Sequence, residues 1–276
     1  MKKISIAVLM TCFNRSKITL ECLSKLFSQE NIENVELNVF LVDDNSPDKT
    51  GKKVKLAFPK VNVIKGTGSL FWCNGTRLAW TYAKKWDPDF YMLLNDDSYL
   101  QKNSIKEMLN IALDQQFDRT SIVVGVCQDP VTLKFSYGGK KRQGFHPLRF
   151  TNIIPNGEVQ SCDSFNGNIV LIPKKIFLKI GMLRKFKHSM GDIDYGLRAV
   201  NAGFKILCTS DFVAQCKINT SVQIKKETAL TEKILILKKQ LPMSDYFKML
   251  WYHCGFLSLI LWPIPYLRVI FGIYRK

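Results

Sequence analysis

Asn95 and two adjacent carboxylates, Asp96 and Asp97, follow a run of five apolar residues, Phe90–Leu94. Such a run, bounded by turn residues, is typical of a short buried strand. Neighbouring carboxylates repel each other and are costly to bury without a partner. A divalent cation or a set of hydroxyl donors would stabilise them, which predicts a ligand site. The alternative is an Asx turn in which Asp97 or Ser98 caps the helix expected over 105–113.

Two further polar clusters follow predicted strands earlier in the chain. The strand predicted over Lys3–Met10 is followed by Thr11–Arg15, and the strand over Glu36–Val42 by Asp43 and Asp44. Alternating strand and helix patterns predict an α/β fold, with an open, mostly parallel sheet and helices on both faces. In such sheets ligands bind at the carboxyl ends of the strands, so we expect the three clusters to face one crevice.

The other predicted elements continue this pattern. Helical spacing predicts helices over 17–28, 50–57, 72–86 and 174–180, and a further helix opened by residues 188–199 and ended by Gly203. Apolar runs predict strands over 61–65, 122–126, 169–172 and 204–208. The glycine-rich loop 66–69 lacks the GxxxxGK[ST] pattern, which excludes an ordinary P-loop ATPase. Residues 129–161 are rich in glycine, proline and basic residues, which predicts a loop-rich insertion.

The formal net charge of +17 points to nucleic acid, an anionic membrane surface or phosphorylated substrates as partners. About ten Lys or Arg against three Asp or Glu lie in residues 217–276, so roughly +7 of this charge belongs to the last fifth of the chain. The eight cysteines form no CxxC pair and no metal-ligand spacing. This predicts reduced thiols in a cytosolic compartment.

The α/β pattern ends near residue 220, which predicts a domain over 1–220 and a helical tail over 221–276. Residues 222–241 are basic and amphipathic, and Met249–Leu267 contains no charged residue. Prolines, a glycine and basic residues on both sides argue against a clean spanning helix. We expect a membrane-associating tail that lies in or re-enters the interface. The alternative is a buried C-terminal helix or an oligomer contact.

Four motifs together resemble the family 2 inverting glycosyltransferases of the GT-A fold. They are Thr11–Arg15, Val42–Ser46, Asn95–Asp97 and Gly191–Ala199, and they occur in the family's order and spacing over residues 1 to about 220. Within the family, the chain is similar to bacterial rhamnosyltransferase-like enzymes. Such enzymes add sugars to lipid-linked surface polysaccharides such as O-antigen or capsule.

The resemblance implies a role for each of five residues at the donor site. Asp44 would accept a hydrogen bond from the N3–H of uracil or thymine, with Thr11 and Arg15 lining the nucleotide pocket. Asp96 would bind the ribose. Asp97 would hold Mn²⁺ or Mg²⁺ against the donor diphosphate, which suits hard cations and oxygen ligands.

The resemblance also implies that Asp192 is the general base, although an Asp there could be a plain N-cap. Asp194 would be the cap or an acceptor contact. Three positions depart from the family pattern. Gly191 replaces a common Glu, Gln215 is the nearest counterpart of a late metal-binding His, and Arg77 replaces a common Asn. Arg77 would reach the diphosphate or lie on a solvated helix face.

Three further positions each have two interpretations. Trp72 would stack on a sugar or pack in the core. The segment Asn166–Asn168 would contact a substrate or only turn the chain. His188 would meet acceptor phosphate or lie free on the surface.

The sequence therefore predicts a metal-dependent inverting glycosyltransferase. It would move a sugar from a UDP- or dTDP-sugar to a polyprenyl-diphosphate-linked glycan, as a peripheral or monotopic protein on the cytoplasmic face of the cell membrane. An anionic membrane surface is the expected partner, and no nucleic acid is expected. The alternatives are a nucleotidyltransferase and a non-catalytic basic module that binds membrane or nucleic acid on the same fold.

Overall fold

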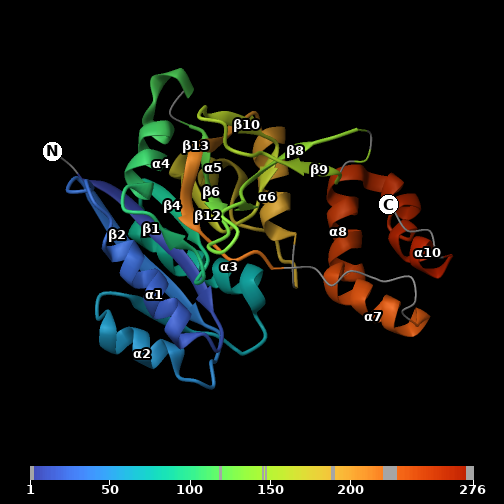
Figure 1. Cartoon of the computed structure of the whole chain (residues 1–276), viewed down its shortest axis with the longest axis horizontal. Coiled ribbons are helices and arrows are strands. Elements are labelled where there is room, and N and C mark those ends of the chain that lie inside the picture. The colour runs from blue at the N-terminus through green and yellow to red at the C-terminus, as the bar shows by residue number, and fades with distance from the viewer. Residues whose placement is uncertain are drawn as a thin grey trace.

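A computed structural model describes residues 3–117, 120–144, 146, 148–187, 190–219 and 229–271. A mixed β-sheet with helices on both faces forms its body, and a C-terminal group of helices lies beside that body (Figure 1). The predicted boundary at residues 220 and 221 lies outside the described residues.

The N-terminal half of the sheet is parallel, as predicted. It contains β1 (Ile4–Cys12), β2 (Val35–Asp43), β3 (Asn62–Lys65) and β4 (Phe90–Leu94), in the order β4-β1-β2-β3. The register pairs Cys12 with Asp43, so the carboxyl ends of β1 and β2 lie side by side. The polar clusters after these strands are therefore brought to one edge.

The other half makes the sheet mixed. β12 (Ile169–Pro173) runs antiparallel to both β4 and β6 (Ile122–Gln128), and β13 (Ile206–Gln215) is parallel to β6. Because β12 is antiparallel to both of its neighbours, β6 and β13 run in the same direction as β1 to β4. The prediction of a mostly parallel sheet is therefore confirmed for these six strands, and β12 is the exception. Apolar runs reveal buried strands but not their direction, because a strand buried on both faces has the same composition either way.

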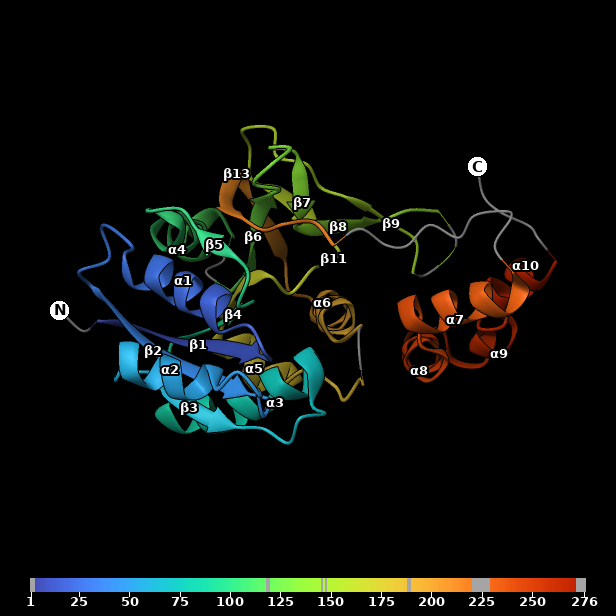
Figure 2. The same cartoon turned by 60° about the horizontal axis from the view of Figure 1, so that its bottom comes forward.

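Successive side chains of the central strands point to opposite faces of the sheet, and helices cover both faces (Figure 2). Ile6, Val8 and Met10 of β1 pack in one apolar cluster, whereas Ala7 and Leu9 pack in the other. The first cluster includes residues of α1 (Ser16–Phe27), α2 (Thr50–Ala57) and α4 (Ser104–Leu113). The second includes residues of α3 (Phe71–Ala83), α5 (Lys174–Ile180) and α6 (Gly191–Asn201). Both faces are thus covered.

The predicted loop-rich insertion contains several short strands. These are β7 (Phe135–Tyr137), β8 (Gly139–Arg142), β9 (Phe150–Asn152) and β10 (Gln160–Cys162). β8 pairs with β9 and with β11 (Ser164–Phe165) in a small second sheet. β5 (Tyr99–Leu100), which the sequence did not predict, pairs with β13. All eight cysteines are free thiols.

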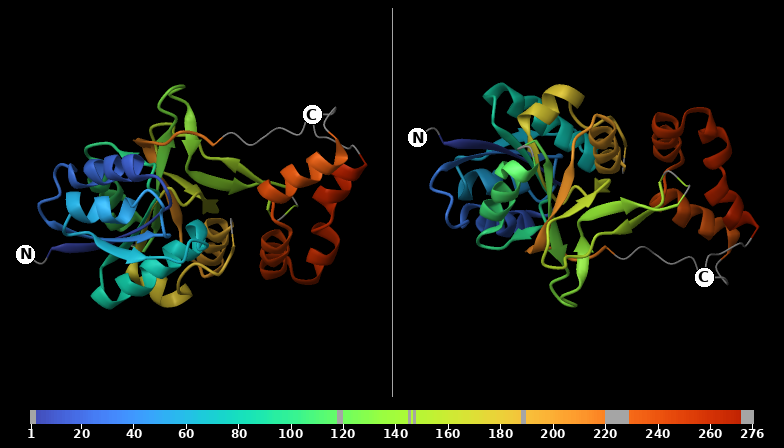
Figure 3. Two further views of the ribbon diagram at one scale, coloured as in Figure 1. Left: turned by 90° about the horizontal axis from the view of Figure 1, so that it is seen from below. Right: turned by 90° about the horizontal axis from the view of Figure 1, so that it is seen from above.

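The C-terminal group consists of α7 (Leu230–Gln240), α8 (Met243–Cys254), α9 (Ser258–Leu261) and α10 (Ile264–Ile270). Met243–Ile270 is long and apolar enough to cross a membrane by length and composition. Its helical structure is interrupted after α8, where Gly255 adopts a φ of +54°. Figure 3 shows α8 alongside α6 in two views.

Candidate active site

A cavity of about 330 Å³ opens where the carboxyl ends of β1, β2 and β4 meet. It contains five of the seven predicted site residues, so the expected convergence of the polar clusters is confirmed. Its lining residues are Thr11, Cys12, Phe13, Arg15, Asp44, Phe71, Trp72, Asn95, Asp96, Asp97 and Asn219.

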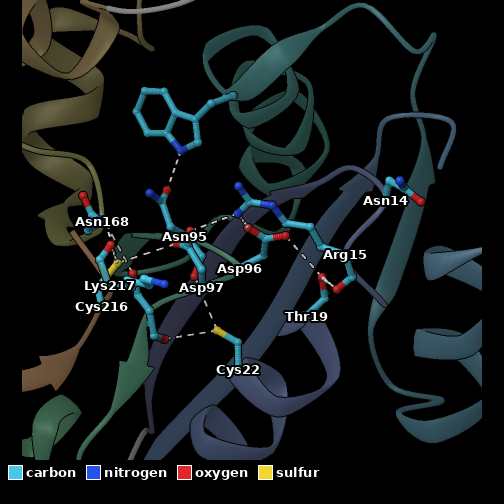
Figure 4. A network of polar contacts seen from close by, with 12 residues as sticks. Asn14, Arg15, Thr19, Cys22, Asn95, Asp96, Asp97, Asn168, Cys216 and Lys217 are labelled. Atoms are coloured by element: carbon cyan, nitrogen blue, oxygen red, sulfur yellow. Dashed lines mark hydrogen bonds and ion pairs between the residues drawn. The ribbon is translucent and has the colours of Figure 1, made fainter. Parts of the chain in front are cut away.

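Arg15 lies between the two adjacent carboxylates (Figure 4). Its Nη1 is 3.0 Å from Asp96 Oδ1 and 2.9 Å from Asp97 Oδ2, and Thr19 donates to Asp96 Oδ2 over 3.2 Å. Burial raises the pKa of Asp96 to about 6, although Arg15 opposes this shift. Neither Asp97 nor Ser98 caps the next helix, because β5 intervenes and α4 begins at Ser104 after Asn103. The capping interpretation is therefore wrong.

The carboxylate pair fits a cation that is shared with a ligand. Within the described part of the chain, no group of three or more His, Cys, Asp or Glu side chains is arranged to hold a metal ion. Mg²⁺ and similar ions are commonly held by one or two carboxylates, with substrate phosphates completing the shell. Asp97 has a side chain 27% exposed, next to the buried Asp96, and both already face a cationic group. Gln215 instead pairs with β5 and is not among the cavity-lining residues.

Asp44 is buried and organises the glycine-rich loop. Its Oδ1 accepts the backbone N–H of Gly68 over 2.7 Å, and its Oδ2 accepts those of Leu70 and Phe71 over 2.8 and 3.2 Å. A Cβ at Gly66 would lie 2.6 Å from Asp44 Oδ1, so only glycine permits this approach. A carboxylate oxygen offers two acceptor positions. Among the described residues Oδ1 accepts only one of these hydrogen bonds, which leaves it a second acceptor position.

Asp192 is the second residue of α6, and its side chain is half-buried. Its Oδ2 accepts the N–H of Gly167 over 3.0 Å, and its Oδ1 that of Ile193 over 2.9 Å. Burial raises the pKa of Asp192, while these two N–H groups oppose the shift. The residue before the helix is Met190, so Asp192 is not a plain N-cap. A carboxylate with a raised pKa is a stronger proton acceptor than an ordinary Asp.

Trp72 connects the carboxylate pair with the region of Asp192. Its Nε1 donates to Asn95 Oδ1 over 2.6 Å, directly before Asp96 in the chain. A Cβ at Gly167 would lie 2.5 Å from the indole and 3.3 Å from the Cβ of Asp192. The indole therefore packs against this loop and also lines the cavity, so both interpretations of Trp72 describe part of its environment.

Close packing of α6 on α3 requires a glycine directly before Asp192. A Cβ at Gly191 would lie 2.5 Å from Cys73 Sγ, near the start of α3. A larger residue there would displace one of the two helices. This close approach explains why Gly191 stands where the resemblance suggests Glu.

Arg77 does not reach the cavity. Its Nη1 donates to the carbonyl of Leu183, and it lines a separate cavity formed with residues between 180 and 202. The predicted diphosphate contact of Arg77 is therefore wrong, because α3 directs this side chain toward the segment before α6. Asp194 is neither a helix cap nor exposed to an acceptor, since it is fully buried among basic side chains. His188 lies outside the described residues.

The segment Asn166–Asn168 contacts residues that lie next to the carboxylate pair. The carbonyl of Asn168 accepts the N–H of Asn95 over 2.9 Å, and Asn168 Nδ2 contacts the thiol of Cys216 at 3.3 Å. That thiol lies 3.7 Å from Asp97 Oδ1. The loop thus holds the residues on both sides of the carboxylate pair.

Asn219 is a cavity residue that the sequence did not indicate. Asp129 Oδ2 accepts the N–H of Ile218 over 3.0 Å, and Tyr137 accepts that of Asn219 over 2.8 Å. These contacts hold the chain after β13 at the cavity. Since the partners are separated by more than eighty residues, no local sequence signal marks them.

Comparisons with known proteins agree with this architecture. The family model "Glycosyl transferase family 2" matches residues 7–169. The structure is similar to that of "Mannosyltransferase PcManGT from Pyrobaculum calidifontis in complex with GDP-Man and Mn2+". The TM-score is 0.58 and the identity 10%, over 100% of this chain and 77% of that one. Among curated proteins, no sequence matches the chain. The fold is the predicted GT-A fold; the chain belongs to glycosyl transferase family 2 and is a glycosyltransferase.

Proposed function

We propose that this enzyme is a metal-dependent inverting glycosyltransferase of bacterial cell-surface polysaccharide synthesis. Its donor is a UDP- or dTDP-sugar, with rhamnose the sugar suggested by the family resemblance, and its acceptor is a polyprenyl-diphosphate-linked glycan. One observation carries this proposal. A single cavity collects Thr11, Arg15, Asp44 and the carboxylate pair, and Trp72 connects it with the region of Asp192.

The nucleotide is recognised at the β1 and β2 ends of the cavity. Asp44 Oδ1 accepts the N3–H of uracil or thymine at its remaining acceptor position, beside Thr11. Asp96 accepts a ribose hydroxyl, and Arg15 lies where it can face the diphosphate. A buried acceptor discriminates against a base without the matching donor, because its lone pair would then be unpaired.

Asp97, with Asp96 beside it, would hold Mn²⁺ or Mg²⁺ at the donor diphosphate. When bound, the ion supplies Lewis-acid stabilisation of the negative charge on the leaving nucleoside diphosphate. The chain's own contribution is the placement of two carboxylates in the lining of the cavity.

Asp192 accepts the proton in the transfer step. The acceptor hydroxyl gives its proton to the Asp192 carboxylate while its oxygen forms a bond to the anomeric carbon. The bond from that carbon to the diphosphate oxygen breaks, and its electron pair leaves with the nucleoside diphosphate. Because the acceptor attacks directly from the face opposite the leaving group, the anomeric configuration is inverted.

The acceptor is brought by a membrane surface, on which the C-terminal helices lie at the cytoplasmic face. Large apolar side chains of α8 to α10, and of the residues that join and follow these helices, are exposed, including Phe256 at 81%, Ile260 at 66% and Phe271 at 70%. Lys248 and Arg268 are exposed within the same helices. Exposed apolar and basic residues on short helices favour binding in the interface of an anionic bilayer.

A thermal-shift experiment with UDP, dTDP, GDP and CDP, each with Mn²⁺ and with EDTA, tests the donor. A ligand that binds the folded state raises the melting temperature. We expect a metal-dependent rise with UDP or dTDP alone. A rise with GDP alone would replace the donor by a GDP-sugar, the class bound by the similar mannosyltransferase. No rise with any nucleotide would contradict the donor assignment.

A further inference from the structure

Asp194 is fully buried, and three basic side chains surround it. Arg184 Nη1 and His253 Nε2 each lie 3.0 Å from its Oδ1, and Arg198 Nε lies 2.8 Å from its Oδ2. Burial alone would raise the pKa of Asp194, but the His253 hydrogen bond and the two arginines lower it. The carboxylate is therefore ionised and paired, which is the condition under which a buried charge is tolerated.

The three partners come from three different parts of the chain. Arg198 lies one turn further along α6, and Arg184 belongs to the segment before that helix. His253 belongs to the last turn of α8, and its side chain is only 4% exposed. The carboxylate thus joins the helix that carries Asp192 to the C-terminal group of helices.

Two more contacts attach α8 to the same segment. The Arg184 guanidinium lies over the Tyr252 ring, 4.2 Å from its centroid. At the other end of α8, the backbone N–H of Lys187 donates to Asp245 Oδ1 over 3.0 Å. α8 is therefore bound at both of its ends to the region of α6, in addition to being connected through the chain.

The start of α6 is held from the opposite side by the sheet. Ser164 of β11 donates to the carbonyl of Ile193 over 3.1 Å, and Gly191 packs closely on Cys73. The first turn of α6 lies between these contacts and α8. A shift of α8 against the body would act first on this turn, which contains Asp192.

We propose that His253 is a positioning residue for the transfer reaction. By donating to Asp194, it holds the first turn of α6 so that Asp192 meets the acceptor hydroxyl, and the C-terminal group thereby takes part in catalysis as well as in attachment. This inference rests on the proposed role of Asp192 as the base.

Three variants of the full chain, in detergent, test the contact. H253L removes the hydrogen-bond donor but keeps an apolar side chain of comparable bulk. H253Q keeps an N–H donor at the same reach, and S244A changes an exposed residue in the first turn of α8. We expect hydrogen exchange in residues 191–201 to be at least about tenfold faster in H253L than in wild type. Exchange in Phe90–Leu94 should be unchanged, and H253Q and S244A should resemble wild type.

Kinetics separate positioning from general stability. A small misplacement of a reacting group costs up to about 100-fold in rate. We therefore expect kcat of H253L to fall about 10- to 100-fold, with donor KM and donor binding within about twofold of wild type. H253Q should recover most of the rate. If H253L fails to fold, H253N, whose amide is too short to reach Asp194, takes its place.

The outcomes are distinguishable. Unchanged exchange in residues 191–201, or loss of donor binding together with kcat, overturns the positioning role. A wild-type protein that transfers no sugar from any donor refutes the proposed function. The exchange comparison would then still decide whether His253 holds α6.

Discussion

Asp192 and Asp194 lie two residues apart in α6, but their surroundings give them different chemistry. Burial raises the pKa of Asp192, whereas the partners of Asp194 keep its pKa below the ordinary value. Of the two, Asp192 is therefore better suited to accept a proton. We expect D192N to lower kcat by about 10²- to 10⁴-fold while nucleotide binding is kept. Steady-state kinetics and thermal shift with UDP measure the two effects, and full activity in D192N would refute the base assignment.

The pH dependence follows from the same carboxylate. A general base acts in its deprotonated form, so the rate falls as the pH falls through the pKa of Asp192. Since burial raises that pKa above 3.8, the acid limb should lie at higher pH than for an exposed Asp. The measurement is kcat against pH at saturating donor. A rate that stays constant down to pH 4 would contradict the assignment.

The proposed role of Asp97 as a metal ligand predicts how its loss changes nucleotide binding. We expect D97N to remove the extra melting-temperature rise that Mn²⁺ gives to the nucleotide, since an amide is a poor ligand for hard cations. The rise measured in EDTA should remain. D87N is the matched control, because Asp87 is 72% exposed and pairs with Lys174 away from the cavity. A Mn²⁺ effect that survives in D97N would exclude Asp97 as the ligand.

The site residues that follow predicted strands could be placed from the sequence alone. The clusters after β1, β2 and β4 required only the rule that parallel strands end at one edge. The partners of Arg77 and Asp194 were not predictable, because Leu183 and His253 lie 106 and 59 residues away. Such contacts depend on how two elements pack, which residue types and local spacing do not reveal.

At the scale of elements, the packing of α3 against α6 restricts which residue can stand at position 191. Gly191 approaches Cys73 so closely that G191A should overpack the contact and cost about 1–3 kcal/mol of unfolding free energy. Since the obstacle is a single sulfur atom, C73A should relieve it in the double variant. Chemical denaturation of both single variants and the double variant gives the coupling energy. Strictly additive effects would show that Cys73 is not the obstacle.

Most elements were predictable from periodicity, because each helix buries one stripe and each central strand is apolar throughout. The direction of β12 was not, and neither was the reach of β13 to Gln215 beside β5. Both depend on chain reversal after the insertion, where glycine and proline mark turns without specifying which strands pair. The half of the sheet that holds the predicted nucleotide residues was the predictable half.

At the scale of the whole molecule, the exposed apolar residues of α8 to α10 need an explanation. A large apolar surface is unfavourable in water and marks a protein or membrane contact. The basic residues nearby and the interrupted helical structure favour a position in the bilayer interface over a single straight span. The bonds from α8 to the region of α6 would then fix the orientation of the catalytic cavity relative to the lipid.

Membrane binding should depend on particular side chains of this surface. Burying one Phe or Ile contributes about 1.5–3 kcal/mol, so F256S/I260S should weaken partition into anionic vesicles by about 100-fold or more. L56S is the matched control, because Leu56 of α2 is 82% exposed, like Phe256 at 81%, but lies in the catalytic body. Vesicle flotation at low and high salt measures the apolar and electrostatic parts separately. If F256S/I260S binds vesicles as wild type does, the surface serves a protein contact, and the acceptor must reach Asp192 without help from a docked C-terminal group.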